Sequence, residues 1–164
     1  MLKNHHLRTT CRQCSSSDLT LAIKIKKTPP ANSFVKRSQI DLIQSSYPLN
    51  VYFCNECKHL QLVDVIDPEY LYENYLYVSG TSNVFIKHFQ DYFRSVKENY
   101  FKNGLIIDIG SNDGTLLRFF KEDGFKVLGI EPAKKIATEA LNKGIPTLID
   151  FFSNDLSNRV LASH

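Results

Sequence analysis

Four cysteines form two CxxC pairs, Cys11 with Cys14 and Cys54 with Cys57. Each CxxC turn directs two sulfurs toward one point, and backbone N–H groups stabilise the thiolate charge. The 39 residues at positions 15–53 separate the pairs, more than the ~15–20 of compact four-cysteine patterns. A hairpin must therefore bring the second pair back to the first. The pattern predicts a closed, tetrahedral structural zinc site with no open position for water.

Other roles for these cysteines fit the pattern less well. A redox CxxC is a single pair at a helix start beside a βαβ unit, and neither pair satisfies that description. Reactive or merely buried thiols remain the alternative. His59, next to the second pair, is interpreted as a solvated residue because four sulfurs already complete the coordination.

A second candidate site is the glycine loop in LIIDIGSNDGTLL. It predicts a strand, a tight loop and a helix, a turn at which ligands meet the backbone closely. The loop is neither GxGxxG nor a phosphate-binding loop. S-adenosylmethionine has no phosphate and needs close backbone approach plus acids for its ammonium and ribose groups. The candidate cofactor residues of this loop are Asp108, Gly110, Ser111, Asn112 and Gly114.

Two further acids follow later strands. Glu131 ends the KVLGI stretch, 21 positions after Gly110, where a carboxylate accepts ribose hydroxyls in such folds. Glu131 and the adjacent Pro132 join the candidate cofactor residues, as does Asp150, expected near the adenine. The alternative is that Asp108 and Glu131 are only strand-end charges and Asp150 a turn residue.

The elements that position these residues fall into three segments. Residues 1–66 hold short alternating stretches and turn-forming residues, which predict a small β-rich zinc module. Residues 67–103 form a tyrosine-rich helical connector. Residues 104–164 alternate as β-α-β-α-β, with consecutive apolar residues in LIIDI and KVLGI as buried parallel strands require. The predicted class is α/β, ending in an incomplete, three-strand Rossmann-type sheet.

Local signals refine the helices. Thr81, Ser82 and Asn83 are candidate N-caps for the long connector helix. Gly124 and Gly144 suit the left-handed position after a helix. The expected apolar face of the connector helix comprises Val84, Phe85, Phe89, Phe93, Val96 and Tyr100.

Composition limits the possible partners and compartments. The net charge of +3, from 20 basic and 17 acidic residues, does not demand nucleic acid because the charges are interspersed. The N-terminus lacks an apolar signal-peptide core, and no segment approaches the ~18 apolar residues of a membrane span. We therefore expect a cytoplasmic protein without a membrane partner. In that reducing compartment, paired cysteines are thiolate ligands more often than disulfides.

The chain resembles the N-terminal portion of the sugar C-methyltransferases that act on nucleotide-linked deoxyhexoses. The matching segments are CRQC, FCNECKHLQL, DPEYLYENYLYVSGTS, DIGSNDGTLL, GIEPA and GIPTLIDFF. The resemblance implies a zinc-binding module, a class I methyltransferase core and a further C-terminal domain. Lys58 stands where the family often has glycine, which affects loop geometry rather than ligation.

The resemblance also implies a cofactor, S-adenosylmethionine, and a substrate, a nucleotide-linked keto-deoxysugar, with the zinc module helping to form the sugar-nucleotide site. Tyr75, Tyr77 and Ser79 are then expected to face substrate or cofactor. A tyrosine stripe used only for packing is the alternative. His88 qualifies as a base only if it faces the cleft, and a structural role is the favoured interpretation.

Only 14 residues, 151–164, follow Asp150. They suffice for one helix but not for another parallel strand, so the first strand is expected to have an open apolar edge that an oligomer or partner chain covers. C-methylation needs a base to remove a proton beside the sugar carbonyl, and the resemblance places that base beyond this chain. We expect the polypeptide to be inactive alone. The competing hypotheses are a ribosomal RNA methyltransferase with a zinc module and a non-catalytic zinc-ribbon binding module.

Overall fold

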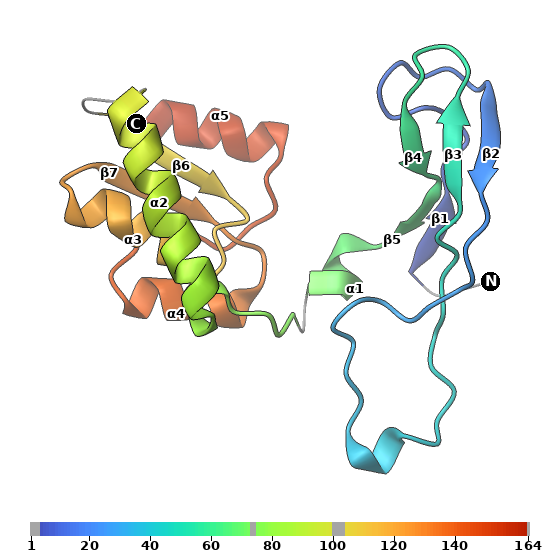
Figure 1. The fold of residues 1–164 in the computed structure, drawn as a ribbon, viewed down its shortest axis with the longest axis horizontal. Coiled ribbons are helices and arrows are strands. Elements are labelled where there is room, and N and C mark those ends of the chain that lie inside the picture. Colours follow the sequence, from blue (N-terminus) through green and yellow to red (C-terminus); the bar gives the residue numbers. More distant parts are fainter. Residues whose placement is uncertain (1–3, 73–74, 100–103, 164) are drawn as a thin grey trace. The chain divides into compact units, whose positions relative to one another are not determined.

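The computed structural model describes residues 4–72, 75–99 and 104–163 (Figure 1). The chain divides into two compact units, Met1–Tyr75 and Leu76–His164. The predicted connector is distributed over both units, with helix α1 (Pro68–Tyr72) in the first and helix α2 (Asn83–Asn99) in the second. The division into three segments stays a prediction.

The first unit is built from short antiparallel strands, as the turn-rich sequence predicts. Strands β2, β3 and β4 form one sheet in that order, and β1 pairs with β5. The strands are β1 (His5–Leu7), β2 (Leu19–Ile23), β3 (Val51–Cys54), β4 (Leu60–Leu62) and β5 (Asp64–Ile66). The β-rich module is thereby confirmed.

A long excursion connects β2 to β3 and returns the second cysteine pair to the first. Leu19 is paired with Cys54 across these strands. Farther out, Thr28 and Tyr47 form an isolated bridge in which each backbone N–H donates to the other residue's carbonyl. The single turn of 3-10 helix η1 (Arg37–Gln39) lies beyond that bridge.

The second unit contains the predicted β-α-β-α-β sequence. Its parallel sheet has the order β6-β7-β8, consistent with a partial Rossmann-like fold. The elements are 3-10 helix η2 (Ser79–Thr81), β6 (Leu105–Ile109), α3 (Thr115–Glu122), β7 (Lys126–Ile130), α4 (Lys134–Asn142), β8 (Thr147–Leu148) and α5 (Asn154–Ser163). Gly124 and Gly144, which follow α3 and α4, have φ of +93° and +78° as expected.

Helices cover both faces of this sheet (Figure 1). On one face, α2, α3 and α4 pack against the sheet around Leu117 and Phe120. On the other face, Leu156 and Val160 of α5 pack against Leu128 and Ile130. The sheet therefore lies between two layers of helices. In open α/β sheets, ligands bind in the crevice outside the carboxyl ends of the strands.

Helix α2 begins as the capping signals predict but presents a narrower apolar face than expected. The Ser82 hydroxyl accepts a hydrogen bond from the Phe85 backbone N–H at 3.4 Å, while Phe93 and Val96 pack against the core. Val84 is 80% exposed, so its assignment to that face was wrong. At ~100° per residue, the nine positions from Val84 to Phe93 place them on opposite sides of the helix. Tyr100 lies outside the described residues.

Within the described ranges, no helix has both the length and the apolar character needed to cross a membrane.

Candidate metal centre and cofactor loop

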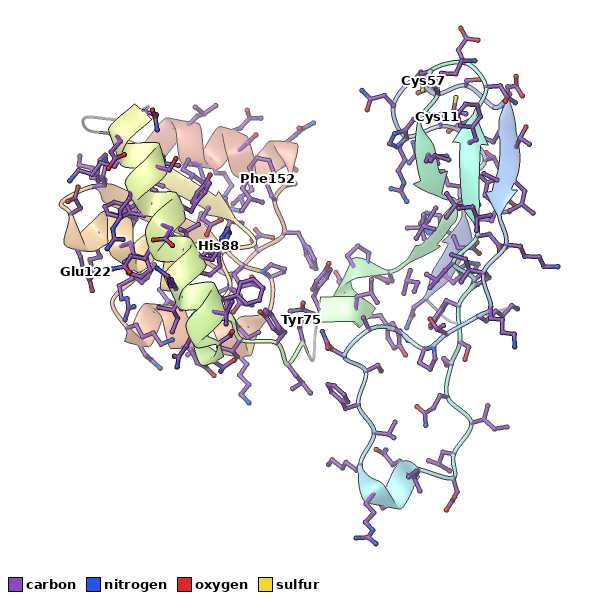
Figure 2. All side chains as sticks on the ribbon, viewed as in Figure 1. Cys11, Cys57, Tyr75, His88, Glu122 and Phe152 are labelled. Carbon is purple, nitrogen blue, oxygen red and sulfur yellow. The ribbon has the colours of Figure 1, made fainter. Side chains whose placement is uncertain are left out.

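The four cysteines converge at one end of the β2-β3-β4 sheet, where Figure 2 labels Cys11 and Cys57. All four sulfurs lie within 4.8 Å of one another. The Sγ atoms of Cys11 and Cys57 are 3.5 Å apart, and those of Cys14 and Cys54 are 3.6 Å apart. Cys11 and Cys54 are completely buried, whereas Cys14 and Cys57 are exposed.

This donor set fits zinc. A tetrahedron of thiolates with ~2.3 Å Zn–S bonds separates its sulfurs by about 3.8 Å, close to the spacing observed. Four sulfur ligands leave no position for water, so the metal would hold the module together rather than perform chemistry. His59 contributes its carbonyl, which accepts the Cys54 backbone N–H at 2.9 Å. Among the described residues, the candidate ligand cluster consists of the four cysteines.

Backbone N–H groups stabilise negative charge on the cysteine sulfurs. Backbone N–H groups of Cys14 and Gln13, together with neighbouring sulfurs, outweigh burial and lower the pKa of Cys11 to about 6. At Cys57 the His59 backbone N–H favours ionisation, but desolvation and the other three sulfurs raise its pKa to about 12. Crowded sulfurs cannot all ionise without a compensating cation.

The residue after each CxxC pair adopts a left-handed backbone. Ser15 and Lys58 have φ of +63° and +65°, a region that glycine enters freely and lysine does not. Lys58 thus adopts a conformation that glycine would enter without strain, and the effect of the lysine on loop geometry stays a prediction. The four cysteine sulfurs still converge with lysine at this position.

The glycine loop between β6 and α3 rests on the end of β7. The backbone N–H groups of Gly110 and Ser111 both donate to the Ile130 carbonyl, at 2.8 and 3.1 Å. Gly110 has φ +79°, and a Cβ added there would meet nothing within 4 Å. The loop thus presents bare backbone to open space, as a closely approaching cofactor requires.

Glu131 is joined to the same loop. Its carboxylate is buried, with 5% exposure, and accepts the Asn112 backbone N–H at 3.0 Å and the Ala133 backbone N–H at 2.8 Å. A carboxylate has about four acceptor positions, so two remain for ribose hydroxyls. Pro132 lies in the chain between Glu131 and Ala133. The structure therefore brings Gly110, Asn112 and Glu131 together.

Asp108 is a second acid at this strand end. Burial, and secondarily the negative charge of Glu131, raise the pKa of its carboxyl. In the described ranges, no cationic side chain pairs with Asp108. Such a carboxylate gains stability when an ammonium group arrives, so its environment fits the amino-acid head of the cofactor.

The remaining sequence candidates lie outside the glycine loop in the sequence. Asp150 is exposed and pairs with Arg159 at 3.5 Å. His88, labelled in Figure 2, is exposed on α2 beside Phe89. Tyr75 belongs to the first unit, while Tyr77 lies in the second and is 37% exposed.

Sequence reasoning missed a buried cluster under the loop. Asp113 is inaccessible to solvent and accepts hydrogen bonds from Lys143 Nζ and Thr115 Oγ1, both at 2.7 Å. Burial opposes its ionisation, but the bonds from Lys143 and Thr115 outweigh this and lower the pKa. Gly80 packs directly on Asp113, because an added Cβ would lie 2.4 Å from Oδ2. The glycine in VSGTS was the available signal, since glycine often marks close backbone approach.

The first unit contains a groove of about 760 Å³. Pro29, Tyr47, Tyr72 and Tyr75 contribute apolar and aromatic surface, and Arg12 contributes a cation. Ring centroids of Tyr72 and Tyr75 are 5.5 Å apart. The groove has the size and the mixture of apolar and polar groups typical of small-molecule sites.

Comparison with known proteins agrees with this geometry. Residues 11–72 match the family model described as "Putative zinc binding domain". Over 156 residues, 94% of this chain, the sequence is 26% identical to C-methyltransferase NovU from Streptomyces niveus, and it covers 37% of that protein. The expected resemblance is confirmed: the chain is methyltransferase-related and combines a zinc-binding module with part of a Rossmann-like fold.

Proposed function

We propose that this chain is part of an S-adenosylmethionine-dependent C-methyltransferase that acts on a nucleotide-linked keto-deoxysugar. The observation that carries the proposal is the joined site at the ends of β6 and β7. There, the open backbone at Gly110 lies in one loop with Asn112, which is hydrogen-bonded to Glu131. Similarity to a C-methyltransferase supports the reaction class.

Each candidate residue has a distinct role in this proposal. Asp108 would engage the ammonium group, Gly110 would admit the ligand to the backbone, and Glu131 would accept the ribose hydroxyls. Ser111, Gly114 and Pro132 would shape the loop, and Asp150 would lie near the adenine. When bound, the cofactor supplies the methyl group. The four cysteines would hold a structural zinc ion.

The groove of the first unit supports the substrate class. A nucleotide-linked sugar presents a base, phosphates and a sugar ring, for which aromatic side chains and a cation are suitable partners. Tyr72 and Tyr75 offer ring surfaces, and Arg12 offers a guanidinium. In the described part of the chain, that guanidinium forms no ion pair.

The chain spans 37% of the relative's length, and we propose that these residues bind ligands without completing methyl transfer. The base that removes the proton beside the sugar carbonyl would come from elsewhere. A partner surface would cover β6, which pairs only with β7 in the described sheet and exposes Ile107 and Ile109. Transfer of a methyl group to a 4-keto sugar nucleotide by the isolated 164-residue chain would contradict this part of the proposal. The compartment proposed is the cytoplasm.

Titration calorimetry with S-adenosylhomocysteine tests the cofactor site. Glu131→Gln should weaken binding at least tenfold, because it removes a charged acceptor for the ribose hydroxyls and turns an amide toward backbone donors. Asp91→Asn provides a matched control on the exposed face of α2, where Asp91 pairs with Lys87 and Arg94. Unchanged affinity in Glu131→Gln, or no binding by the unaltered chain, would overturn the cofactor assignment.

A further inference from the structure

The side chain of Asn112 connects the cofactor loop to the tyrosine-containing segment that precedes α2. Its Nδ2 donates to the Tyr77 carbonyl at 2.9 Å, and its Oδ1 accepts the Ser79 backbone N–H at 2.8 Å. One amide thus satisfies two backbone groups on either side of residue 78. Both bonds span more than thirty positions of sequence and lie within the second unit.

A second contact fixes the same segment. Gly80 lies against the buried Asp113 carboxylate and the Thr115 hydroxyl, with no room for a Cβ. Residues 77–80 are therefore held against the loop at two successive points, first by Asn112 and then by Asp113.

The backbone of Asn112 faces the candidate cofactor site from the other side. Its N–H donates to Glu131 Oε2 at 3.0 Å, and its φ of +51° is a left-handed conformation that asparagine and glycine tolerate better than other residues. A ligand that fixes Glu131 therefore also fixes the peptide from which the Asn112 side chain projects.

We propose that Asn112 is a positioning residue that couples cofactor binding at Glu131 to the placement of the Tyr77–Gly80 segment. This inference rests on the proposed function. Its consequence is that the cofactor-bound chain holds Tyr77 and Ser79 in one arrangement, and that this arrangement in turn strengthens cofactor binding.

Amide hydrogen exchange measured by NMR on the full chain provides a direct readout, because the Ser79 N–H is one of the coupled bonds. S-adenosylhomocysteine should slow exchange at Ser79 about tenfold, the size expected for stabilising two neutral hydrogen bonds. The Gly129 amide, which donates to the Pro146 carbonyl inside the sheet, serves as the internal reference for folding.

Two substitutions at the same position separate coupling from general stability. Asn112→Gly keeps the left-handed backbone but removes both side-chain bonds. Exchange at Ser79 should become about tenfold faster and insensitive to the ligand, and affinity should fall several-fold. Asn112→Asp keeps an acceptor for Ser79, so it should restore protection there while leaving the Tyr77 carbonyl without its donor.

A third substitution tests the contact between Gly80 and Asp113. Gly80→Ala forces the segment away from Asp113 without altering Asn112 or Glu131, and should also weaken S-adenosylhomocysteine binding. Ligand binding that leaves Ser79 exchange unchanged in the unaltered chain would overturn the coupling alone. Absence of any ligand binding would overturn the proposed function and this inference together.

Discussion

Each of the two units of this chain is stabilised internally by a different means. In the described part of the first unit, the buried apolar side chains are Cys11, Tyr47, Cys54 and Val63. Two of these are candidate metal ligands. The second unit buries two continuous apolar clusters against the faces of its sheet. Small modules with so little buried apolar surface usually depend on a metal or disulfides, whereas the second unit depends on packing.

The comparison predicts that each unit responds to a perturbation that spares the other. Removing the metal should act on the first unit, and removing a core side chain should act on the second. Substitutions of Asp113 and Asp108 should change the stability of the second unit, and its dependence on pH, by smaller amounts.

Metal removal is expected to have the largest effect. Structural zinc contributes about 10–16 kcal/mol to small metal-dependent folds, so a chelator, or Cys54→Ser, should unfold the first unit. Amide exchange should lose protection at Cys54, whose N–H donates to the His59 carbonyl, and retain it at Gly129. If the first unit kept its amide protection without metal, the claim that this unit depends on metal would be wrong.

A core truncation should produce the converse result. Leu117 is fully buried in the cluster between α3 and the sheet, so Leu117→Ala should lower the free energy of unfolding of the second unit by about 2–5 kcal/mol. Zinc content, measured by atomic emission, should not change. Leu161→Ala, at a position that is 78% exposed, is the matched control and should cost less than about 0.5 kcal/mol.

Two acids of the second unit, the buried Asp113 and the partly buried Asp108, should give pH dependences of opposite sign. The pKa of Asp113 is lowered in the folded chain, so its contribution to stability is present above the unfolded pKa and lost as pH falls through the folded value. Asp113→Asn should therefore destabilise the second unit at neutral pH, by about 1–3 kcal/mol.

The pKa of Asp108 is raised, so the folded chain retains a proton that the unfolded chain has released. Stability falls as pH rises from the unfolded pKa through the folded pKa. Asp108→Asn should remove that loss and slightly stabilise the second unit above this range, by less than about 1 kcal/mol. Thermal unfolding of both variants from pH 3 to pH 8 measures the signs, and two shifts in the same direction would contradict the assignments.

Features that depend on local sequence could be predicted. The cysteine ligands, the glycine loop and the parallel strands around it follow from residue type and spacing over a few positions. Glu131 was identified because it ends the strand after the loop, and its hydrogen bond to Asn112 confirms that strand and loop meet. Whether these residues bind the cofactor stays a prediction.

Features that depend on pairs distant in sequence could not be predicted. Nothing local to Asn112 indicates that its side chain binds residues 77 and 79, or that Gly80 lies on Asp113. The error at Val84 arose because a hydrophobic residue one position from Phe85 was assigned to the face of Phe93. At ~100° per residue, the nine positions between Val84 and Phe93 place the two side chains on opposite sides of the helix.

The backbone bridge between Thr28 and Tyr47 has a practical consequence. The two reciprocal N–H···O=C bonds tie together the two arms of the excursion between β2 and β3, so the residues beyond the bridge are separated from the cysteines by a fixed point. Residues 33–43 are all exposed and distant from the cysteines along the chain. They offer a place to insert an affinity tag or attach a fluorophore without disturbing the ligands.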